Sequence, residues 1–345
     1  MLRFLTAGES HGRCMVAILE GMPAGLKVDL KEMNLELKRR QLGLGRGDRM
    51  KIEGDNVEIL SGVRNGLTLG SPIGLYVKNN DYRIDDLIAL TNPRPGHADL
   101  VGCLKYGHQD IRNVLERASA RETVSRVAVG ALCKLFLKEC SIRVSSKAVM
   151  IGGETRQERM KKKVDEARRN LDTLGGMFVV SVEGAPPGLG SYVSADRRLN
   201  ARLAQAFMSI PAIKAVEFGL GIEYARAFGS KVHDAIYYSK EKGYYRKTNN
   251  AGGIEGGMSN GETIVARCTM KPIATVGKPL DSVDIITKKG ARAAVERYDT
   301  CAVEAAGVVA ESCAAFVLSE ALLEKFGADS LVEFKRNYKA YLRSL

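Results

Sequence analysis

Strand-like and helix-like segments follow one another irregularly along this chain, and their order limits the possible folds more than any other feature. Five segments are rich in β-branched or apolar residues, as strands are: 3–7, 72–77, 143–151, 177–183 and 263–270. Apolar residues recur at helical spacing in five others: 30–40, 111–140, 156–171, 197–208 and 300–325. A doubly wound parallel sheet needs regular alternation, so this order predicts a mixed α and β fold of another kind. No linker, low-complexity tract or internal repeat interrupts residues 1–345, and we expect a single domain.

Four stretches are too rich in glycine and polar residues to lie inside helices or strands: 8–12, 43–47, 93–96 and 251–261. Glycine lets the backbone adopt positive φ and approach a ligand closely. Any one of these stretches alone could be an ordinary surface turn. Because His, Arg, Asn and Ser are concentrated in the set, the sequence predicts active-site loops.

The positive charge of the chain predicts an anionic partner. The formal net charge is +12, from 52 Lys and Arg against 40 Asp and Glu. One basic segment, 156–169, has the composition of a solvated helix face, with seven basic and three acidic residues. Other arginines lie in or beside the glycine-rich loops or at helix ends: Arg39, Arg40, Arg46, Arg49, Arg94, Arg117, Arg121 and Arg297. The planar guanidinium suits phosphate and carboxylate groups, so this second set favours a small polyanion.

Nucleic acid is the alternative anionic partner, but the usual recognition features are missing from the sequence. There is no Trp, only 6% of residues are aromatic, and no helix-turn-helix, zinc-finger, cold-shock or RNP-like motif occurs. The spacings of Rossmann and P-loop phosphate sites and of His-rich or Asp-rich metal sites are also absent. We therefore expect no nucleic acid and no metal.

The cysteines and the apolar runs indicate the compartment. Seven scattered cysteines without a C-x-x-C pair are typical of reduced cytosolic thiols. No uninterrupted run of about 18 apolar residues or signal-peptide pattern is found. The sequence therefore predicts a cytoplasmic protein without a membrane partner.

Two of the four histidines stand in glycine-flanked loops, where they can reach a substrate. His11 lies in Gly-Glu-Ser-His-Gly (8–12) and His97 in Arg-Pro-Gly-His-Ala-Asp (94–99). Imidazole exchanges protons near neutral pH, so both are candidate acids or bases; a purely structural hydrogen bond is the alternative for each. Ser10 also fits the Gly-x-Ser-x-Gly pattern of serine hydrolases. That alternative requires a helix after the serine and a later Asp–His pair.

Seven short sequence motifs occur in a fixed order along the chain, and together they are far more specific than any one of them. They are 8–12; 39–41 with 45–50; 94–99; 116–123; 248–261; 270–273; and 296–299. Over essentially its whole length the sequence resembles the chorismate synthase family. The resemblance implies a helical layer sandwiched between antiparallel β-sheets, an α+β fold, and a homotetramer.

The resemblance also implies a reaction. The family is a group of shikimate-pathway lyases that eliminate phosphate and a C6 hydrogen from 5-enolpyruvylshikimate 3-phosphate to give chorismate. It requires reduced FMN although the net reaction is redox-neutral. NADPH is a candidate reductant; the resemblance leaves open whether this chain uses it directly or depends on an external reductase, and the short chain favours the external reductase.

The family's functional positions map onto this chain by resemblance. His11 is the general acid toward the phosphate, His97 protonates or hydrogen-bonds the reduced flavin, and Asp299 works with flavin N5 to remove the C6 proton. Substrate-binding positions are Ser10, Arg40, Arg46, Arg49, Arg94, Ser119, Arg121 and Arg297. Flavin-binding positions are Arg117, Ala118, Ser119, Pro211, Ala212, Gly256, Lys271, Pro272, Ile273, Ala274, Thr275 and Arg297.

At several positions the chain departs from the family pattern. Tyr298 stands where many members have His or Ser, and we expect activity to survive this change. Ala118 and Pro211 replace the more usual Ser and Asn, so a flavin contact at Pro211 would involve the backbone only. The chain is also shorter than many members around residues 152–170.

Overall fold

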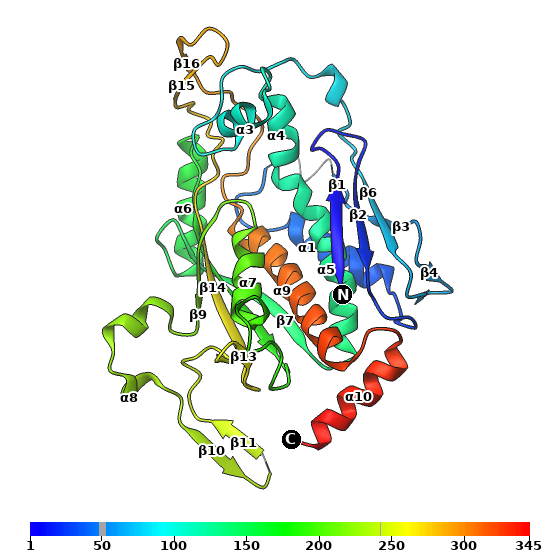
Figure 1. The fold of residues 1–345 in the computed structure, drawn as a ribbon. Helices are drawn as coiled ribbons and strands as arrows, with labels where there is room; N and C mark the ends of the chain where they lie inside the picture. The colour runs from blue at the N-terminus through cyan, green and yellow to red at the C-terminus, as the bar shows by residue number, and fades with distance from the viewer. Residues whose placement is uncertain (48–52, 242) are drawn as a thin grey trace.

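Two antiparallel sheets enclose a layer of helices in the computed structural model, which describes residues 1–47, 53–241 and 243–345 (Figure 1). The first sheet has the order β1 (Arg3–Ala7), β2 (Cys14–Glu20), β6 (Ile73–Lys78) and β3 (Val57–Ile59). The second has the order β7 (Arg143–Ile151), β8 (Gly176–Glu183), β14 (Ile264–Met270) and β9 (Ile213–Phe218). Alternate residues of β14 are buried, as in a strand with one face against a core.

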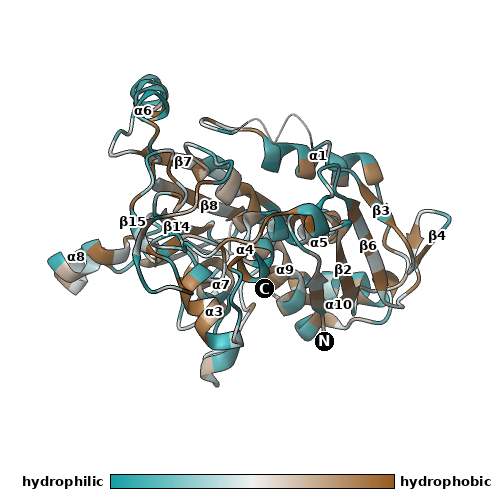
Figure 2. Ribbon diagram, turned by 90° about the horizontal axis from the view of Figure 1, so that it is seen from above, coloured by the Kyte–Doolittle hydropathy of each residue, from teal (hydrophilic) through white to brown (hydrophobic). Residues whose placement is uncertain are grey.

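The helical layer consists chiefly of α1 (Leu30–Gln41), α5 (Thr123–Lys138), α7 (Leu199–Met208) and α9 (Val303–Phe326). Helix α5 packs on the first sheet, α9 packs on the second, and the two helices pack on each other (Figure 2). A helix enclosed in this way must be apolar on all sides, and nearly all of α9 is buried. The expected α+β sandwich is confirmed.

The remaining elements lie outside this core. The helices are α3 (Asp99–Tyr106), α4 (Arg112–Ala118), α6 (Gln157–Arg169), α8 (Gly229–Val232) and α10 (Leu331–Arg343). Short 3₁₀ segments are η1 (Ile84–Asp86), η2 (Ala120–Glu122), η3 (Ala195–Arg197) and η4 (Gly221–Arg226). Two-stranded hairpins are β4–β5 (Val63–Arg64, Leu67–Thr68), β10–β11 (Ile236–Ser239, Gly243–Arg246), β12–β13 (Ile254–Glu255, Met258–Ser259) and β15–β16 (Asp281–Val283, Gly290–Arg292).

The sequence located all five expected strands to within a residue at each end, but it was wrong about one helix. Residues 111–140 do not form a continuous helix, because the backbone is extended at Ser119, between α4 and η2. The Ser119 side chain accepts a hydrogen bond from the Arg121 amide and caps the new turn. This break brings Ser119 and Arg121 to the site described below.

By length and composition, α9 could cross a membrane, but 89% of its most apolar window is buried inside the fold. Several glutamate and serine residues interrupt its apolar sequence. One of these, Glu311, has a fully buried carboxylate. That carboxylate pairs with Arg39 of α1 and Lys134 of α5, and it accepts a hydrogen bond from the Ser146 hydroxyl of β7. In this fold α9 is therefore the central core helix.

Helices α5 and α9 approach each other closely at Gly130. A Cβ atom added there would lie 2.2 Å from Cβ and 2.4 Å from Cα of Ser312 on α9. We expect Gly130→Ala to lower the free energy of unfolding by about 1–3 kcal/mol, because overpacking outweighs the better helix propensity of alanine. Chemical denaturation measures the change. At Gly290 an added Cβ meets nothing within 4 Å in the described chain, so Gly290→Ala is the control; equal stability of the two variants would contradict the close packing.

Candidate active site

A cavity of about 1180 Å³ opens where the N-terminal ends of α5 and α9 meet the glycine-rich loops. Most of the predicted site residues line it: Ser10, His11, Arg40, Arg46, Arg94, His97, Ala118, Ser119, Arg121, Pro211, Ala212, Lys271, Ile273, Ala274, Thr275, Arg297 and Asp299. Their positions span nearly the whole chain. The N-terminal ends of helices carry partial positive charge, so two of them at one cavity add to the attraction of the arginines for anions.

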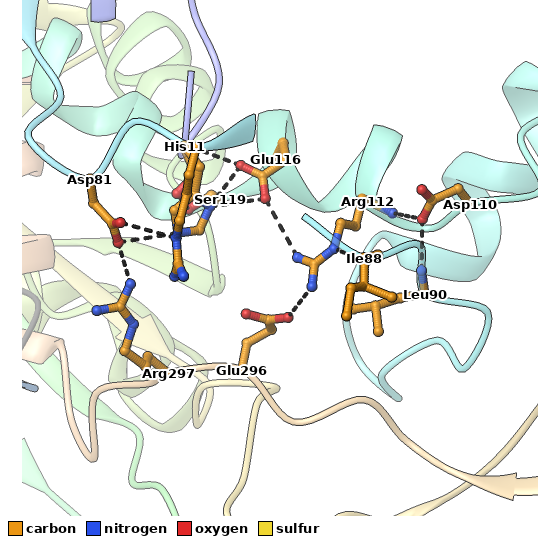
Figure 3. Close-up of polar contacts among 12 residues, drawn as sticks. His11, Asp81, Ile88, Leu90, Asp110, Arg112, Glu116, Ser119, Glu296 and Arg297 are labelled. Carbon is orange, nitrogen blue, oxygen red and sulfur yellow. Dashed lines mark hydrogen bonds and ion pairs between the residues drawn. The ribbon is translucent and has the colours of Figure 1, made fainter. Parts of the chain in front are cut away.

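His11 lies between two carboxylates on the loop that joins β1 to β2. Its Nδ1 atom is 3.0 Å from each carboxylate oxygen of Glu116, and its Nε2 atom is 3.7 Å from Oδ2 of Asp81 (Figure 3). Asp81 also pairs with Arg297. The ring is buried in the cavity wall with Nε2 on the side away from Glu116. Because this loop leads into a strand and not into a helix, the hydrolase interpretation of Ser10 is wrong.

His97 and Arg94 share the carboxylate of Asp99. The guanidinium of Arg94 donates to both Asp99 oxygens, at 2.8 and 3.0 Å, and to the Thr275 hydroxyl at 2.7 Å. Nδ1 of His97 hydrogen-bonds to the same carboxylate. Burial raises the pKa of Asp99, but the hydrogen bonds and charges of His97 and Arg94 outweigh burial and hold that pKa well below the ordinary range. Asp99 is therefore ionised and fixes both side chains.

Arg40 and Arg121 form the deepest positive part of the cavity, on either side of Asp55. Arg40 donates to one Asp55 oxygen at 2.7 Å, and Arg121 donates to the other at 2.5 Å. Arg121 also lies 3.5 Å from Glu53, and both carboxylates are fully buried. Among the described residues, Nε of Arg40 has no hydrogen-bond partner although it is buried. Both guanidinium groups line the cavity, where their charge favours an anionic ligand.

Asp299 lies on the segment before α9 and faces the loop 43–47. One of its carboxylate oxygens accepts from the Gly47 amide at 2.7 Å, and the other pairs with Arg46. Gly47 has no room for a side chain, because an added Cβ would lie 2.8 Å from the Tyr298 carbonyl oxygen. The loop therefore holds the candidate base beside a candidate substrate-binding arginine.

The wall formed by the predicted flavin positions is largely apolar. Residues 211–212 are joined to the segment 271–275 by a hydrogen bond of 2.9 Å from the Lys271 amide to the Ala212 carbonyl. Ala212 has φ of 69°, an unusual conformation for a residue with a side chain. The first turns of α9 add a floor of small residues: Ala302, Ala305, Ala306 and Val309. Such a surface suits a flat aromatic ring, with Lys271 at its polar end.

Three of the predicted positions that the structure describes do not line this cavity. Arg49 lies outside the described residues. Arg117 turns away and donates to the carbonyl oxygens of Gly8 and Thr6, and Pro272 is absent from the lining although its neighbours belong to it. Gly256 joins β12 to β13, and no residue of the predicted loop 251–261 belongs to the lining of this cavity.

The sequence interpretation missed the acidic partners of the site and one basic residue. Asp55, Asp81, Asp99 and Glu116 each hold an arginine or a histidine of the cavity in place. Arg168 lines the cavity, although its segment was interpreted as a solvated helix face. That interpretation is correct for most of α6, whose buried residues are Met160, Val164 and Ala167. Asp99 and Glu116 lie inside the motif runs 94–99 and 116–123, which was an available signal for those two, whereas Asp55 and Asp81 lie outside every such run.

Asp99 should make the stability of the protein dependent on pH. Its folded-state pKa is lowered, so its contribution is complete above the ordinary carboxyl pKa of about 4 and is lost as the pH falls. We expect Asp99→Asn to cost about 3 kcal/mol at pH 7, because Arg94 loses its buried partner, and to weaken the decline in stability between pH 5 and 3. Thermal melts across this range measure both effects. Asp281→Asn, at an exposed ion pair, is the control; unchanged pH dependence in Asp99→Asn would refute the assignment.

Comparisons with known proteins agree with this architecture. The sequence profile of the chorismate synthase family matches residues 2–323. The chorismate synthase of Thermoanaerobacter pseudethanolicus is 55% identical over 344 residues, covering 99% of this chain and 98% of that protein. The chorismate synthase of Pelobacter propionicus is 52% identical over 386 aligned positions, more than the length of this chain, which fits the expectation that some members are longer.

A solved structure gives the same result for the fold. A crystal structure of chorismate synthase superimposes with a TM-score of 0.82 at 43% identity, covering 99% of this chain and 98% of that one. Sequence, fold and a cavity lined by the family motifs therefore agree: the chain belongs to the chorismate synthase family, the carbon–oxygen lyases that form chorismate from 5-enolpyruvylshikimate 3-phosphate in aromatic amino-acid biosynthesis.

Proposed function

We propose that this chain carries out the family reaction with reduced FMN, and that flavin and substrate occupy the one cavity together. The observation that carries the proposal is the convergence of both loop histidines, Asp299 and five of the predicted substrate-binding arginines on that cavity. Its volume of about 1180 Å³ exceeds the roughly 300–1,000 Å³ typical of a pocket for one small ligand. Both expected ligands are anionic, as the surrounding charge requires.

The described residues fit a flavin. The small side chains of α9 leave room for a planar ring, and Lys271 and Arg168 provide positive charge for a phosphate. Burial, and to a lesser extent the charge of Lys214, lowers the pKa of Lys271. A bound anion would stabilise the charged form of this ammonium group. When bound, reduced flavin supplies the electron-rich ring on which the family depends. At Pro211 the contact would come from the backbone.

In this proposal His11 assists departure of the phosphate, and Asp299 assists departure of the C6 proton. The C3–O and C6–H bonds of the substrate break, the ring double bond shifts and a second one forms, and phosphate and a proton leave without net oxidation. His11 donates a proton to the phosphate oxygen through Nε2, and Asp299 assists removal of the C6 proton. Arg40, Arg46, Arg94, Arg121 and Arg297 bind the phosphate and the two carboxylates, with Arg49 as a further candidate.

The proposal extends to assembly and location. The described residues 220–241 and 243–246, with α8 and β10–β11, extend away from the sandwich and expose Phe228, Tyr238 and Tyr244 (Figure 1). An exposed apolar arm of this kind suits contact with further copies, in agreement with the proposed homotetramer. Within such an assembly Gly256 would reach a flavin only from a neighbouring subunit. The cytoplasm, where the free thiols stay reduced, is the proposed compartment.

An anaerobic turnover assay tests the proposed function. With photoreduced FMN and 5-enolpyruvylshikimate 3-phosphate, we expect equal amounts of chorismate and phosphate, with the flavin still reduced at the end. A parallel assay with oxidised FMN and NADPH tests the dependence on an external reductase, which predicts no product until such a reductase is added. Salt-sensitive RNA binding without any chorismate formation would support the nucleic-acid alternative instead.

A further inference from the structure

Three donors from residues 10 and 11 converge on one residue of α4, Glu116. Its backbone carbonyl accepts from the Ser10 amide at 2.9 Å, and its carboxylate accepts from the His11 amide at 2.8 Å. Both carboxylate oxygens lie 3.0 Å from Nδ1 of the His11 ring. The Glu116 side chain is only 3% exposed, so these contacts face little competition from water. One helical residue thus fixes both the backbone and the ring of His11.

The chemistry of this contact determines which ring nitrogen exchanges protons. Burial raises the pKa of Glu116, but the hydrogen bonds and charge of His11, with the charge of Arg112, outweigh burial and lower it. An ionised carboxylate only accepts hydrogen bonds, so Nδ1 must carry the hydrogen. The Nε2 atom, facing Asp81 and the cavity, is left to exchange the proton.

The carboxylates on both sides of His11 are tied to the segment that contains Asp299. Arg112 lies 3.9 Å from Glu116 and donates to Glu296 at 3.1 Å. On the other side of the ring, Asp81 pairs with Arg297 (Figure 3). Glu296 and Arg297 are adjacent in the chain and lie three and two residues before Asp299. They therefore connect the carboxylates on both sides of His11 to the segment that carries Asp299.

We propose that Glu116 is a positioning residue that keeps Nε2 of His11 directed at the leaving phosphate, and that Arg112 and Glu296 align this pair with Asp299. The inference rests on the proposed role of His11. The charged groups that face His11 are Glu116 of α4 and Asp81 after β6. Behind them stand Arg112, Arg83 and Arg297. Glu116 is the one that contacts the ring within hydrogen-bonding distance.

Glu116→Gln tests the inference with two readouts in the full-length protein. Its amide group can donate to Nδ1, so the ¹⁵N spectrum of His11, assigned by its loss in His11→Gln, should change from Nδ1–H to Nε2–H. With reduced FMN, kcat should fall about 100-fold with KM changed less than threefold. The alkaline limb of the pH–rate profile should move down by about one pH unit, because the protonated donor loses its counter-charge.

Two further variants control for folding and for charge. Glu122→Gln removes a nearby carboxylate that contacts Thr6 and Arg126 and should leave the spectrum and the pH profile unchanged. Glu116→Asp keeps the charge on a shorter side chain, so it should retain Nδ1–H and the alkaline limb while losing part of kcat. Should Glu116→Gln fail to fold, Arg112→Gln should still reduce kcat several-fold with a change in the pH profile.

The outcomes separate this inference from the proposed function. An unchanged His11 tautomer and pH profile in Glu116→Gln would overturn the positioning role and leave the proposed reaction intact. A reversed tautomer with unchanged kcat at every pH would overturn the acid role of His11. The positioning role of Glu116 and the proposed function both depend on that acid role. A fall in activity with an unaltered spectrum and an unaltered profile would mean that Glu116 is only structural, which also overturns the inference.

Discussion

Replacing His11 by alanine should lower kcat for chorismate formation by about 10²–10⁴-fold, the usual contribution of a general acid. The phosphate then has to leave without a proton from Nε2, and Glu116 and Asp81 lose the imidazole ring that lies between them. The predicted flavin positions lie on other segments, so the dissociation constant for FMN should change less than threefold. Anaerobic turnover and flavin fluorescence titration measure the two quantities separately.

A matched variant makes this result specific. His108 stacks on Tyr106 just after the end of α3 and does not line the cavity, so His108→Ala should leave both quantities unchanged. If His11→Ala weakens flavin binding as much as it slows elimination, the role of His11 is structural and the assignment of the acid fails.

Asp299→Asn should lower kcat by about 10²–10⁴-fold and leave the ternary complex intact. An asparagine oxygen can still accept from the Gly47 amide, so the loop keeps its position, but the neutral side chain cannot assist proton removal. Arg46 loses its carboxylate partner and becomes more available to an anionic substrate. We therefore expect unchanged or tighter substrate binding, measured by calorimetry with oxidised FMN.

The contrary outcome for Asp299 is equally clear. If Asp299→Asn fails to bind substrate while remaining folded, then the Asp299–Arg46 pair organises the binding site and another group assists removal of the proton.

Local patterns in the sequence were sufficient for most of the fold. Alternation and apolar runs located strands such as β7 and β14, and helical spacing located α1 and α9. The continuous apolar run of β2 (Cys14–Glu20) was missed, because a short run without alternation does not distinguish a strand from a helix. The break at Ser119 was missed because the apolar periodicity continues across it, and a single cap decides the direction of the chain.

The sequence predicted which loops form the site, but it did not predict which carboxylates pair with the histidines and arginines of those loops. Glycine-rich segments containing His11, His97 and Arg46 indicated where ligands approach. Asp99 lies only two residues from His97, but other carboxylates of the site are supplied by distant parts of the chain: Glu116 lies 105 residues from His11 and Asp81 lies 216 residues from Arg297. No local pattern encodes such a pairing, because it depends on how the helical layer packs between the two sheets.

The most direct test of this account is a crystal structure of the protein with oxidised FMN and 5-enolpyruvylshikimate 3-phosphate, since oxidised flavin should not support turnover. We expect both ligands in the single cavity, with the substrate phosphate within hydrogen-bonding distance of Nε2 of His11. The C6 hydrogen should face the flavin and Asp299, and the arginine side chains should contact the phosphate and carboxylates. A substrate phosphate bound away from His11, or a flavin outside this cavity, would contradict the account.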